Sequence, residues 1–415
     1  MKSLLPKRLK NPALIREKKN LLSEPIRPID LEKTTNIQQL VESFQHASIQ
    51  ARKVGAVGKI FERMLTDSER PTILLGLAGP LIAAGLRKVI RDMIEYGLVD
   101  VIVSTGAILY QDYYQAQGYQ HYKGTPEADD GRLHDLLVDR IYDTYVDEEK
   151  FNALDAKIGY FADQMEPGEY SSRTFLHELS RNITDSNSIL GTAFRKGIPI
   201  FSPAMNDSSI GIGLTEHYHR SKLQNRKGIV INSIRDNYEL TQIVVQSKRT
   251  AAFYVAGGVP KNFINDSIVM AYIFGWDTGG HKYAVQMTTD APHWGGLSGS
   301  TLNEATSWGK VNREASTAMA FVEPSVSLPL VVGYALQKKL YQKRSKIRFD
   351  WKDDVLEKIE YNLASSLPHR GYPDPQEKIH KMGLRGVRGT TKQSKNLRLP
   401  RPPKKSWRAR NDVRD

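Results

Sequence analysis

Lys310 closes a segment, residues 288–310, whose composition is typical of a functional site. The segment reads TTDAPHWGGLSGSTLNEATSWGK and combines glycines, small hydroxyl residues, two tryptophans, two carboxylates and the terminal lysine. It follows a short apolar run, residues 283–287, and its composition predicts an irregular loop rather than a helix or a strand. Loops of this kind often carry binding and catalytic residues.

The place of Lys310 directly after Trp308 and Gly309 predicts a nucleophilic lysine. An indole beside the side chain excludes water, and burial disfavours the ammonium relative to the neutral amine. A neutral lysine amine is a nucleophile that forms imines. The alternative is a solvated surface lysine, which is the common case for an isolated lysine.

The string EATSWGKV, residues 304–311, carries a family resemblance. From about Asn36 to Gln337 the chain resembles deoxyhypusine synthase, both in this string and in the order of its strands and glycine turns. The resemblance implies that Lys310 carries a covalent aminobutyl imine and that NAD oxidises a polyamine and later reduces the transferred group. It also implies a homotetramer with its sites at dimer interfaces.

The resemblance further implies an NAD site in the turns that follow the expected strands. The residues at the matching positions are Gly79, Thr105, Gly106, Ala107, Asp207, Gly257, Gly258, Thr289, Asp290 and Glu323. The glycine spacing after the first strand departs from the dinucleotide fingerprint, so the spacing alone is a weak signal. Gly79 and Pro80 stand where serine and asparagine are common, whereas Glu323 keeps the carboxylate that a ribose needs.

The amine side of the predicted site matches the family less well. Its expected residues are Gln111, Asn262, Gly295, Gly296, Leu297, Glu304 and Trp308. Several positions lack the charge or the base found in the spermidine-using enzymes: Gln111, Ile212 and Leu297 are neutral, Trp294 replaces an aspartate, and Asn262 replaces a histidine. Each lost charge-assisted hydrogen bond is worth about 1.5–3 kcal/mol. Asp112, Asp290 and His293 are candidate replacements.

The resemblance therefore implies an NAD-dependent aminoalkyl transferase that acts on a polyamine-type substrate through an imine on Lys310, with an altered amine pocket. Homospermidine formation is one related activity, and the acceptor is expected to be a small amine rather than a protein lysine. Two alternatives stay open. One is an NAD-dependent amine dehydrogenase in which Lys310 only positions the substrate. The other is a non-catalytic NAD-binding homologue.

Apolar runs that alternate with helical periodicity predict an α/β fold with a doubly wound, mostly parallel, Rossmann-like sheet. The expected strand-to-helix units start at residues 71–78, 99–107, 198–214, 228–234, 251–263 and 282–290. Helical patterns run over residues 149–164 and 173–194, and two helices broken near Gly55 are expected over residues 36–65.

Composition divides the chain into a basic arm (residues 1–35), an NAD-binding catalytic domain (36–345), one more helix (346–368) and a basic tail of low order (369–415). The net charge of +13 comes from the two ends: residues 381–415 hold twelve Lys/Arg against two Asp, and residues 1–30 hold eight against three acids. The body is therefore near neutral. A nucleic-acid partner is expected at most through the tail.

Other classes of protein are disfavoured by what the sequence lacks. It contains no cysteine, which excludes disulfides, thiolate zinc sites and a cysteine nucleophile. It has neither an 18-residue apolar run nor the apolar core of a signal peptide, which predicts a cytoplasmic protein without a membrane partner. Glu216, His217 and His219 are poorly spaced for one helical face, so no metal site is expected.

Overall fold

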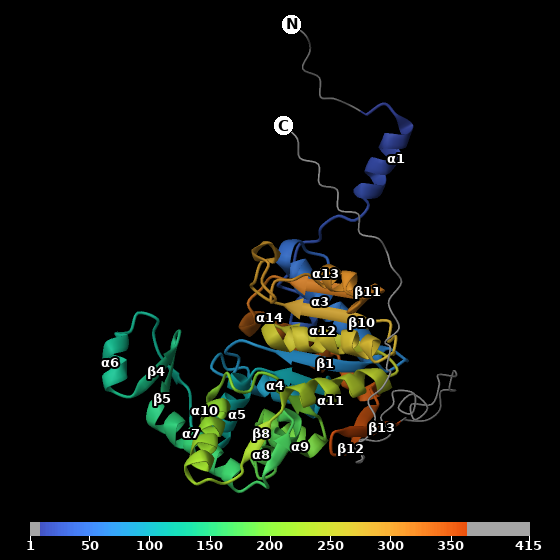
Figure 1. Cartoon of the computed structure of the whole chain (residues 1–415). Coiled ribbons are helices and arrows are strands. Elements are labelled where there is room, and N and C mark those ends of the chain that lie inside the picture. The colour runs from blue at the N-terminus through green and yellow to red at the C-terminus, as the bar shows by residue number, and fades with distance from the viewer. Residues whose placement is uncertain (1–8, 363–415) are drawn as a thin grey trace, which may run out of the picture. The chain divides into compact units, whose positions relative to one another are not determined.

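A six-stranded parallel sheet forms the centre of the protein (Figure 1), whose computed structural model describes residues 9–362. The strand order is β11-β10-β9-β1-β2-β7, and each neighbouring pair is parallel. The strands are β1 (Thr72–Leu77), β2 (Val101–Ser104), β7 (Ile200–Phe201), β9 (Thr250–Val255), β10 (His281–Met287) and β11 (Val311–Ala320). The predicted α/β fold with a mostly parallel sheet is confirmed.

The sheet is wound in two directions from its middle. β1 is followed by β2 and β7 on one side, whereas β9, β10 and β11 extend the sheet on the other side. The inner strands β1 and β9 are buried along their whole length, which explains their continuous apolar sequence. In such sheets ligands bind at the carboxyl ends of the strands, where the winding changes direction. Here that point lies between β1 and β9.

Helices cover both faces of the sheet. α3 packs against β10 and β11, and α12 packs against β1 and β2. The helices are α1 (Pro12–Leu21), α2 (Ile37–Phe44), α3 (Ile49–Thr66), α4 (Arg87–Glu95), α5 (Gly106–Ala116), α6 (Asp130–Asp135), α7 (Glu148–Asp163), α8 (Ser172–Ser180), α9 (Ile189–Lys196), α10 (Ser209–Leu223), α11 (Ser233–Gln246), α12 (Gly258–Ile273), α13 (Leu302–Ser307) and α14 (Pro324–Gln337), with 3-10 turns η1 (Pro292–Trp294) and η2 (Leu340–Lys343). Among the described helices, none is long and apolar enough to span a membrane.

Small sheets surround the central one. β3 (Tyr122–Lys123), β5 (Thr144–Asp147) and β4 (Val138–Ile141) form an antiparallel sheet between α5 and α7. β8 (Ile229–Ile231) was expected to belong to the main sheet, but it pairs with β6 (Gly168–Tyr170) instead.

The helix predicted over residues 346–368 is wrong for the part that the structure describes. Residues 346–362 form an antiparallel hairpin of β12 (Lys346–Lys352) and β13 (Val355–Asn362), which packs against α11. The sequence KIRFDWK alternates polar and apolar residues, and this period of two is the pattern of a strand. Residues 363–368 and the predicted tail, 369–415, lie outside the described residues.

Three other expectations about local structure are corrected. The first two helices break at residues 45–48 rather than at Gly55, which lies inside α3, where an added Cβ would be 2.6 Å from the backbone of Gln45. Residues 173–194 form two helices, because Ser188 caps the start of α9 by accepting a hydrogen bond from the Gly191 amide. The 288–310 segment is not wholly irregular, since it contains η1 and α13.

A buried charge cluster joins the sheet to the chain that leads into the hairpin. Asp100, directly before β2, accepts hydrogen bonds from Arg70 at 2.8 and 2.9 Å, from Arg344 at 2.6 Å and from the Ile73 amide at 2.8 Å. Burial acts to raise the pKa of Asp100, but Arg344 and Arg70 outweigh it and hold the pKa below its usual value. The cluster is stable only as a unit, because any member left alone is a buried, unpaired charge.

We expect Asp100→Asn to lower the free energy of unfolding by roughly 3–5 kcal/mol, because it leaves two buried guanidinium groups without their carboxylate. Urea denaturation measures the loss. Asp130→Asn is the matched control, since the Asp130 side chain is 63% exposed in its pair with Arg140 and its loss should leave the free energy of unfolding nearly unchanged. Equal losses in the two variants would contradict the assignment.

Candidate active site

The predicted cofactor residues gather along one edge of the central sheet. Each follows the carboxyl end of a strand: Gly79 after β1, Thr105, Gly106 and Ala107 after β2, Asp207 after β7, Gly257 and Gly258 after β9, Thr289 and Asp290 after β10, and Glu323 after β11. Because the strands are parallel, these turns meet at the same edge. We call this set the carboxyl rim.

The carboxyl rim has features that fit a dinucleotide. α5 and α12 begin there, after strands that flank β1, and among the described residues no side chain caps either helix at Thr105 or Gly257. The first backbone N–H groups of α5, and those of Gly258 and Val259 in α12, therefore lack a side-chain acceptor, as at helix starts that bind phosphates, whereas Pro260 has no N–H. Gly79 has a φ of +87°, and the nearest atom to an added Cβ there is 3.9 Å away. Its turn therefore leaves room above β1.

Two glycines of the carboxyl rim do not have the role expected from the sequence. A Cβ on Gly106 would lie 2.3 Å from the Ser208 hydroxyl, and one on Gly257 would lie 2.5 Å from the Cα of Ser298. The close approach that these glycines allow is therefore made by the protein's own chain rather than left for a ligand. Glu323 is exposed, but its carboxylate caps α14 by accepting from the Ser325 amide at 2.7 Å.

Lys310 lies apart from the carboxyl rim in its backbone position. It directly precedes β11, and its carbonyl accepts a hydrogen bond from the His281 amide at the start of β10 (3.0 Å). β10 spans about 20 Å at the usual rise per residue, so this end of the sheet is well separated from the rim. The side chain of Lys310 lies against α12.

The Lys310 nitrogen is held by two residues of α12. It forms an ion pair with Asp266 Oδ1 at 2.9 Å and donates to Asn262 Oδ1 at 3.3 Å, and its side chain is only 14% exposed. The Trp308 ring centroid is 5.4 Å from the nitrogen, but the tryptophan is 69% exposed. The expected enclosure by the indole is therefore replaced by polar contacts with α12.

A second lysine, Lys261, holds the 297–300 part of the loop. It is 1% exposed, and its ammonium lies 2.6 Å from the Ser300 carbonyl, 3.0 Å from the Ser300 hydroxyl and 3.4 Å from the Leu297 carbonyl. Burial lowers the pKa of Lys261 to about 8, against the opposing effect of the Glu304 and Asp290 carboxylates. One buried cation therefore links the loop to α12.

The other predicted substrate residues differ in their accessibility. Glu304 is exposed and belongs to a capping box with Thr301 at the start of α13. Gln111 is 8% exposed and accepts a hydrogen bond from the Ala83 amide at 3.2 Å. Gly295, Gly296 and Leu297 form an exposed turn.

Asp112, named from the sequence as a replacement acid, is wrong for that role. It is fully buried and accepts hydrogen bonds from Arg87, the Ser188 hydroxyl and the Ile189 and Leu190 amides, at 2.7–2.9 Å. This carboxylate caps α9 and has no capacity left for a substrate. The other candidates, Asp290 and His293, are exposed on the loop.

His217, which the sequence analysis considered with Glu216 and His219 as a metal ligand, has a structural role. His217 is buried, its Nδ1 faces Asp163 Oδ1 at 2.5 Å, and its Nε2 accepts from the Ile229 amide at 3.1 Å. Both ring nitrogens are thereby used within the fold. In the described part of the chain, no group of three metal-ligating side chains comes together.

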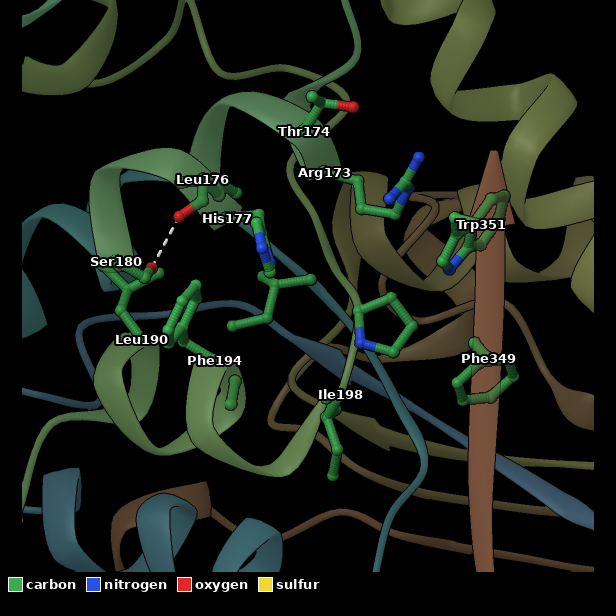
Figure 2. A pocket seen from close by; sticks show the side chains of 14 residues that line it. Arg173, Thr174, Leu176, His177, Ser180, Leu190, Phe194, Ile198, Phe349 and Trp351 are labelled. Atoms are coloured by element: carbon green, nitrogen blue, oxygen red, sulfur yellow. Dashed lines mark hydrogen bonds between the residues drawn. The ribbon is translucent and has the colours of Figure 1, made fainter. Parts of the chain in front are cut away.

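A hollow of about 260 Å³ lies at the opposite end of the sheet from the carboxyl rim (Figure 2). It is lined by α8, α9, the start of β7 and the hairpin, with the Arg173 guanidinium stacked 3.9 Å over the Trp351 ring. Arg173 is already paired with Glu239 at 2.7 Å. Most of the other residues that line the hollow are apolar, and none of the predicted site residues is among them.

Sequence reasoning missed Asp266 and Lys261. Both lie on α12, four residues after and one residue before Asn262. The i, i+4 spacing of Asn262 and Asp266 places them on one helical face, which was the available signal. No sequence signal indicates the burial of Lys261, because a lysine in an amphipathic helix is normally exposed.

Comparison with known proteins is consistent with this arrangement. The family model described as deoxyhypusine synthase matches residues 39–335. The chain is 43% identical over 340 residues to a deoxyhypusine synthase-like protein of Chlorobaculum tepidum, covering 80% of this chain and 95% of the relative, and 42% identical to that of Chlorobaculum parvum over the same shares. A crystal structure assigned to a deoxyhypusine synthase of Entamoeba histolytica aligns with a TM-score of 0.51 at 18% identity, covering 75% of this chain and 97% of that one, and shares the fold.

We expect the stability of the protein to rise between about pH 8 and pH 10.5 because of Lys261. In this window the unfolded lysine, with a pKa of 10.5, binds more protons than the buried one, so the free energy of unfolding increases by at most about 1.4 kcal/mol per pH unit. The free energy of unfolding is measured by urea titration at several pH values for the wild type and for Lys261→Met. The difference between the two proteins, plotted against pH, gives this slope. Lys88→Met, at a side chain that is 64% exposed, is the control. If the difference in the free energy of unfolding between the wild type and Lys261→Met does not change with pH, the buried ammonium of Lys261 is refuted.

Proposed function

The chain belongs to the deoxyhypusine synthase family, and from this premise we propose that it is an NAD-dependent aminoalkyl transferase that works through an imine on Lys310. The observation that carries the proposal is the setting of the Lys310 nitrogen. It is 14% exposed at its side chain and lies between a carboxylate, an amide oxygen and an indole face. A lysine that only served solubility would extend into water.

The chemistry assigned to Lys310 is an exchange of amines on one carbon. Its neutral amine attacks the C=N carbon of an oxidised donor amine, a C–N bond to Lys310 forms, and the donor's own C–N bond breaks. The remainder of the donor leaves as an amine. The acceptor amine then displaces Lys310 in the same way. Bound NAD would supply the hydride chemistry, by which the donor amine would be oxidised and the transferred chain later reduced.

The carboxyl rim is the proposed NAD site. The open N–H groups at the starts of α5 and α12 would bind the phosphates, and Asp207 or Glu323 would bind a ribose hydroxyl. Glu323 can bind a ribose only while it also caps α14, since its Oε2 already accepts from Ser325. Gly79 has no side chain that would occupy the space above the turn after β1, where the cofactor would lie.

The substrates are proposed to be small amines. Gln111, Ile212 and Leu297 provide no charge where spermidine-using relatives carry acids. A substrate with several ammonium groups would therefore be desolvated at these positions without compensation. The exposed Trp308 and Glu304 offer an aromatic face and one carboxylate for a cation. This pattern favours a small acceptor amine, as in homospermidine formation, over a protein lysine.

A homotetramer is proposed in which one site uses residues of two chains. Membership of the deoxyhypusine synthase family favours sites at dimer interfaces, where Lys310 of one chain would act with the carboxyl rim of another. The exposure of large apolar side chains supports an interface: Trp294 is 75% exposed, Trp308 69% and Tyr272 73%. Burying such side chains on association is favourable.

We expect borohydride, added with NAD and a panel of amines, to fix an adduct on Lys310. Peptide mass mapping locates it. Lys310→Ala should form no adduct and should lose transfer by on the order of 10⁴-fold, as expected for loss of a nucleophile. Lys196→Ala, at a lysine paired with Glu95, is the control and should keep both. An undiminished rate in Lys310→Ala would end the proposal.

The same reactions separate the alternatives. A plain amine dehydrogenase releases free NADH in proportion to the amine consumed, whereas a transferase returns the hydride to its product. Absorbance at the NADH band, followed together with product masses, distinguishes these cases. A non-catalytic homologue would show NAD binding in calorimetry but neither product nor adduct with any amine.

We expect two inactive variants to complement each other. Asp207→Ala impairs the rim and Lys310→Ala removes the nucleophile, so each alone should be inactive. When the two are co-expressed, mixed assemblies contain some sites with an intact rim from one chain and Lys310 from the other. Recovery of part of the transfer rate is the expected result. If rim and lysine act within one chain, no activity will return.

A further inference from the structure

Asp266 and Asn262 form a fixed pair beside the Lys310 nitrogen. They lie four residues apart on α12 and so occupy one face of the helix. Asp266 Oδ1 contacts Lys310 Nζ at 2.9 Å, and Asp266 Oδ2 accepts from Asn262 Nδ2 at 2.8 Å. The oxygen of the same amide accepts from Lys310 at 3.3 Å. The three side chains therefore make a closed triangle of contacts.

Within the described residues, Asp266 supplies the only carboxylate in ion-pair contact with Lys310. The other charged groups that act on this region are the Lys261 ammonium, buried on the same helix, and the Glu304 and Asp290 carboxylates of the loop. Lys261 is directed to the carbonyls of residues 297–300. The positive charge on Lys310 is thus balanced locally by one residue.

The proposed exchange places a positive charge on the Lys310 nitrogen beside Asp266. Before the exchange, the ammonium carries that charge. After the neutral amine has attacked the oxidised donor, a C=N bond to Lys310 forms, the donor's amine leaves, and the protonated imine carries one positive charge. The protonated form is the reactive electrophile that an acceptor amine attacks. A fixed anion at hydrogen-bond distance favours this form over the neutral imine.

We propose that Asp266 is the counter-ion of Lys310, which holds the lysine nitrogen against α12 and stabilises the protonated imine once it has formed; the proposal rests on the imine chemistry assigned to Lys310 above. Asn262 cannot perform this role, because an amide carries no charge. Its position between the two groups makes it the residue that orients Asp266.

The side chain of Asp266 is 42% exposed, which suits a counter-ion that must act during turnover. A wholly buried carboxylate would bind the ammonium without leaving space for a carbon chain on the nitrogen. A partly open one lets the chain extend towards solvent and the exposed Trp308. The alternative, a link that only fixes β11 to α12, predicts an effect on stability and none on the imine.

The test uses the full chain and a coloured aldehyde, which requires neither NAD nor a polyamine. Para-dimethylaminocinnamaldehyde forms an imine with lysine whose absorption shifts to longer wavelength on protonation. We expect an adduct on Lys310 in the wild type, located by borohydride reduction and peptide mapping, and none in Lys310→Ala. A pH titration of the absorption gives the proton affinity of the imine.

The proton affinity of the imine should fall by about tenfold or more in Asp266→Asn, which keeps the size and loses the charge. Asp266→Glu should restore most of it if the variant folds with the carboxylate in reach. Glu95→Gln is the matched control, because it removes a carboxylate paired with a distant lysine, Lys196, and so changes the net charge equally. It should leave the proton affinity unchanged.

Three outcomes separate the counter-ion from the proposed transfer reaction. Equal proton affinities in the wild type and Asp266→Asn would overturn the counter-ion, even if transfer through Lys310 holds. A shift in Asp266→Asn without any transfer by the wild type in the amine panel would support the counter-ion and refute the transferase. No adduct on Lys310 in the wild type would overturn both.

Discussion

The packing of α12 against the middle of the sheet sets the geometry on which the candidate site depends. At Gly76 of β1, an added Cβ would lie 3.1 Å from the Tyr254 ring and 3.3 Å from Ile264 of α12, so the helix sits close to the strand. The buried hydrogen bond from the Tyr254 hydroxyl to Asn265, at 2.8 Å, fixes the rotation of the helix. With one face held in this way, Asn262 and Asp266 project from the opposite face.

Electrostatics then connects α12 to the loop that precedes Lys310. Lys261 is buried because four loop oxygens, three carbonyls and the Ser300 hydroxyl, replace its water. Such a lysine is costly to bury, and its lowered pKa is the measure of that cost. The loss of this charge would remove the donor of the Ser300 carbonyl, whereas the Leu297 and Ser298 carbonyls also accept from the Ser300 hydroxyl and from Gln286. Since Glu304 and Trp308 follow the same loop, their positions depend on Lys261.

The architecture could be predicted from the sequence because it depends on local patterns. Short continuous apolar runs bounded by turn residues, such as residues 72–77, are typical of buried strands in a parallel sheet, and parallel order places the following turns on one edge. The pairing at Lys310 could not be predicted, because Asp266 is distant in sequence and its direction depends on how α12 lies on the sheet. The prediction of Asp112 as a replacement acid failed for the same reason, because tertiary packing brings its partners, residues 188–190, to this carboxylate. The hairpin at 346–362 was a different error, because the alternation of polar and apolar residues in KIRFDWK is visible in the sequence.

The charges around the lysine pair indicate what the site is built to receive. Lys261 and Lys310 contribute two positive charges, and Asp266, Asp290 and Glu304 contribute three negative ones, so the group carries a surplus of one negative charge. One ammonium of a substrate would neutralise it, and the exposed Trp308 ring offers a face for that cation. A substrate with more ammonium groups would have to extend towards the neutral positions Gln111 and Leu297, where no carboxylate compensates for lost water. For the proposed transferase, these charges favour a substrate that brings one ammonium close to Lys310, with Asp266 as the proposed counter-ion of the lysine nitrogen.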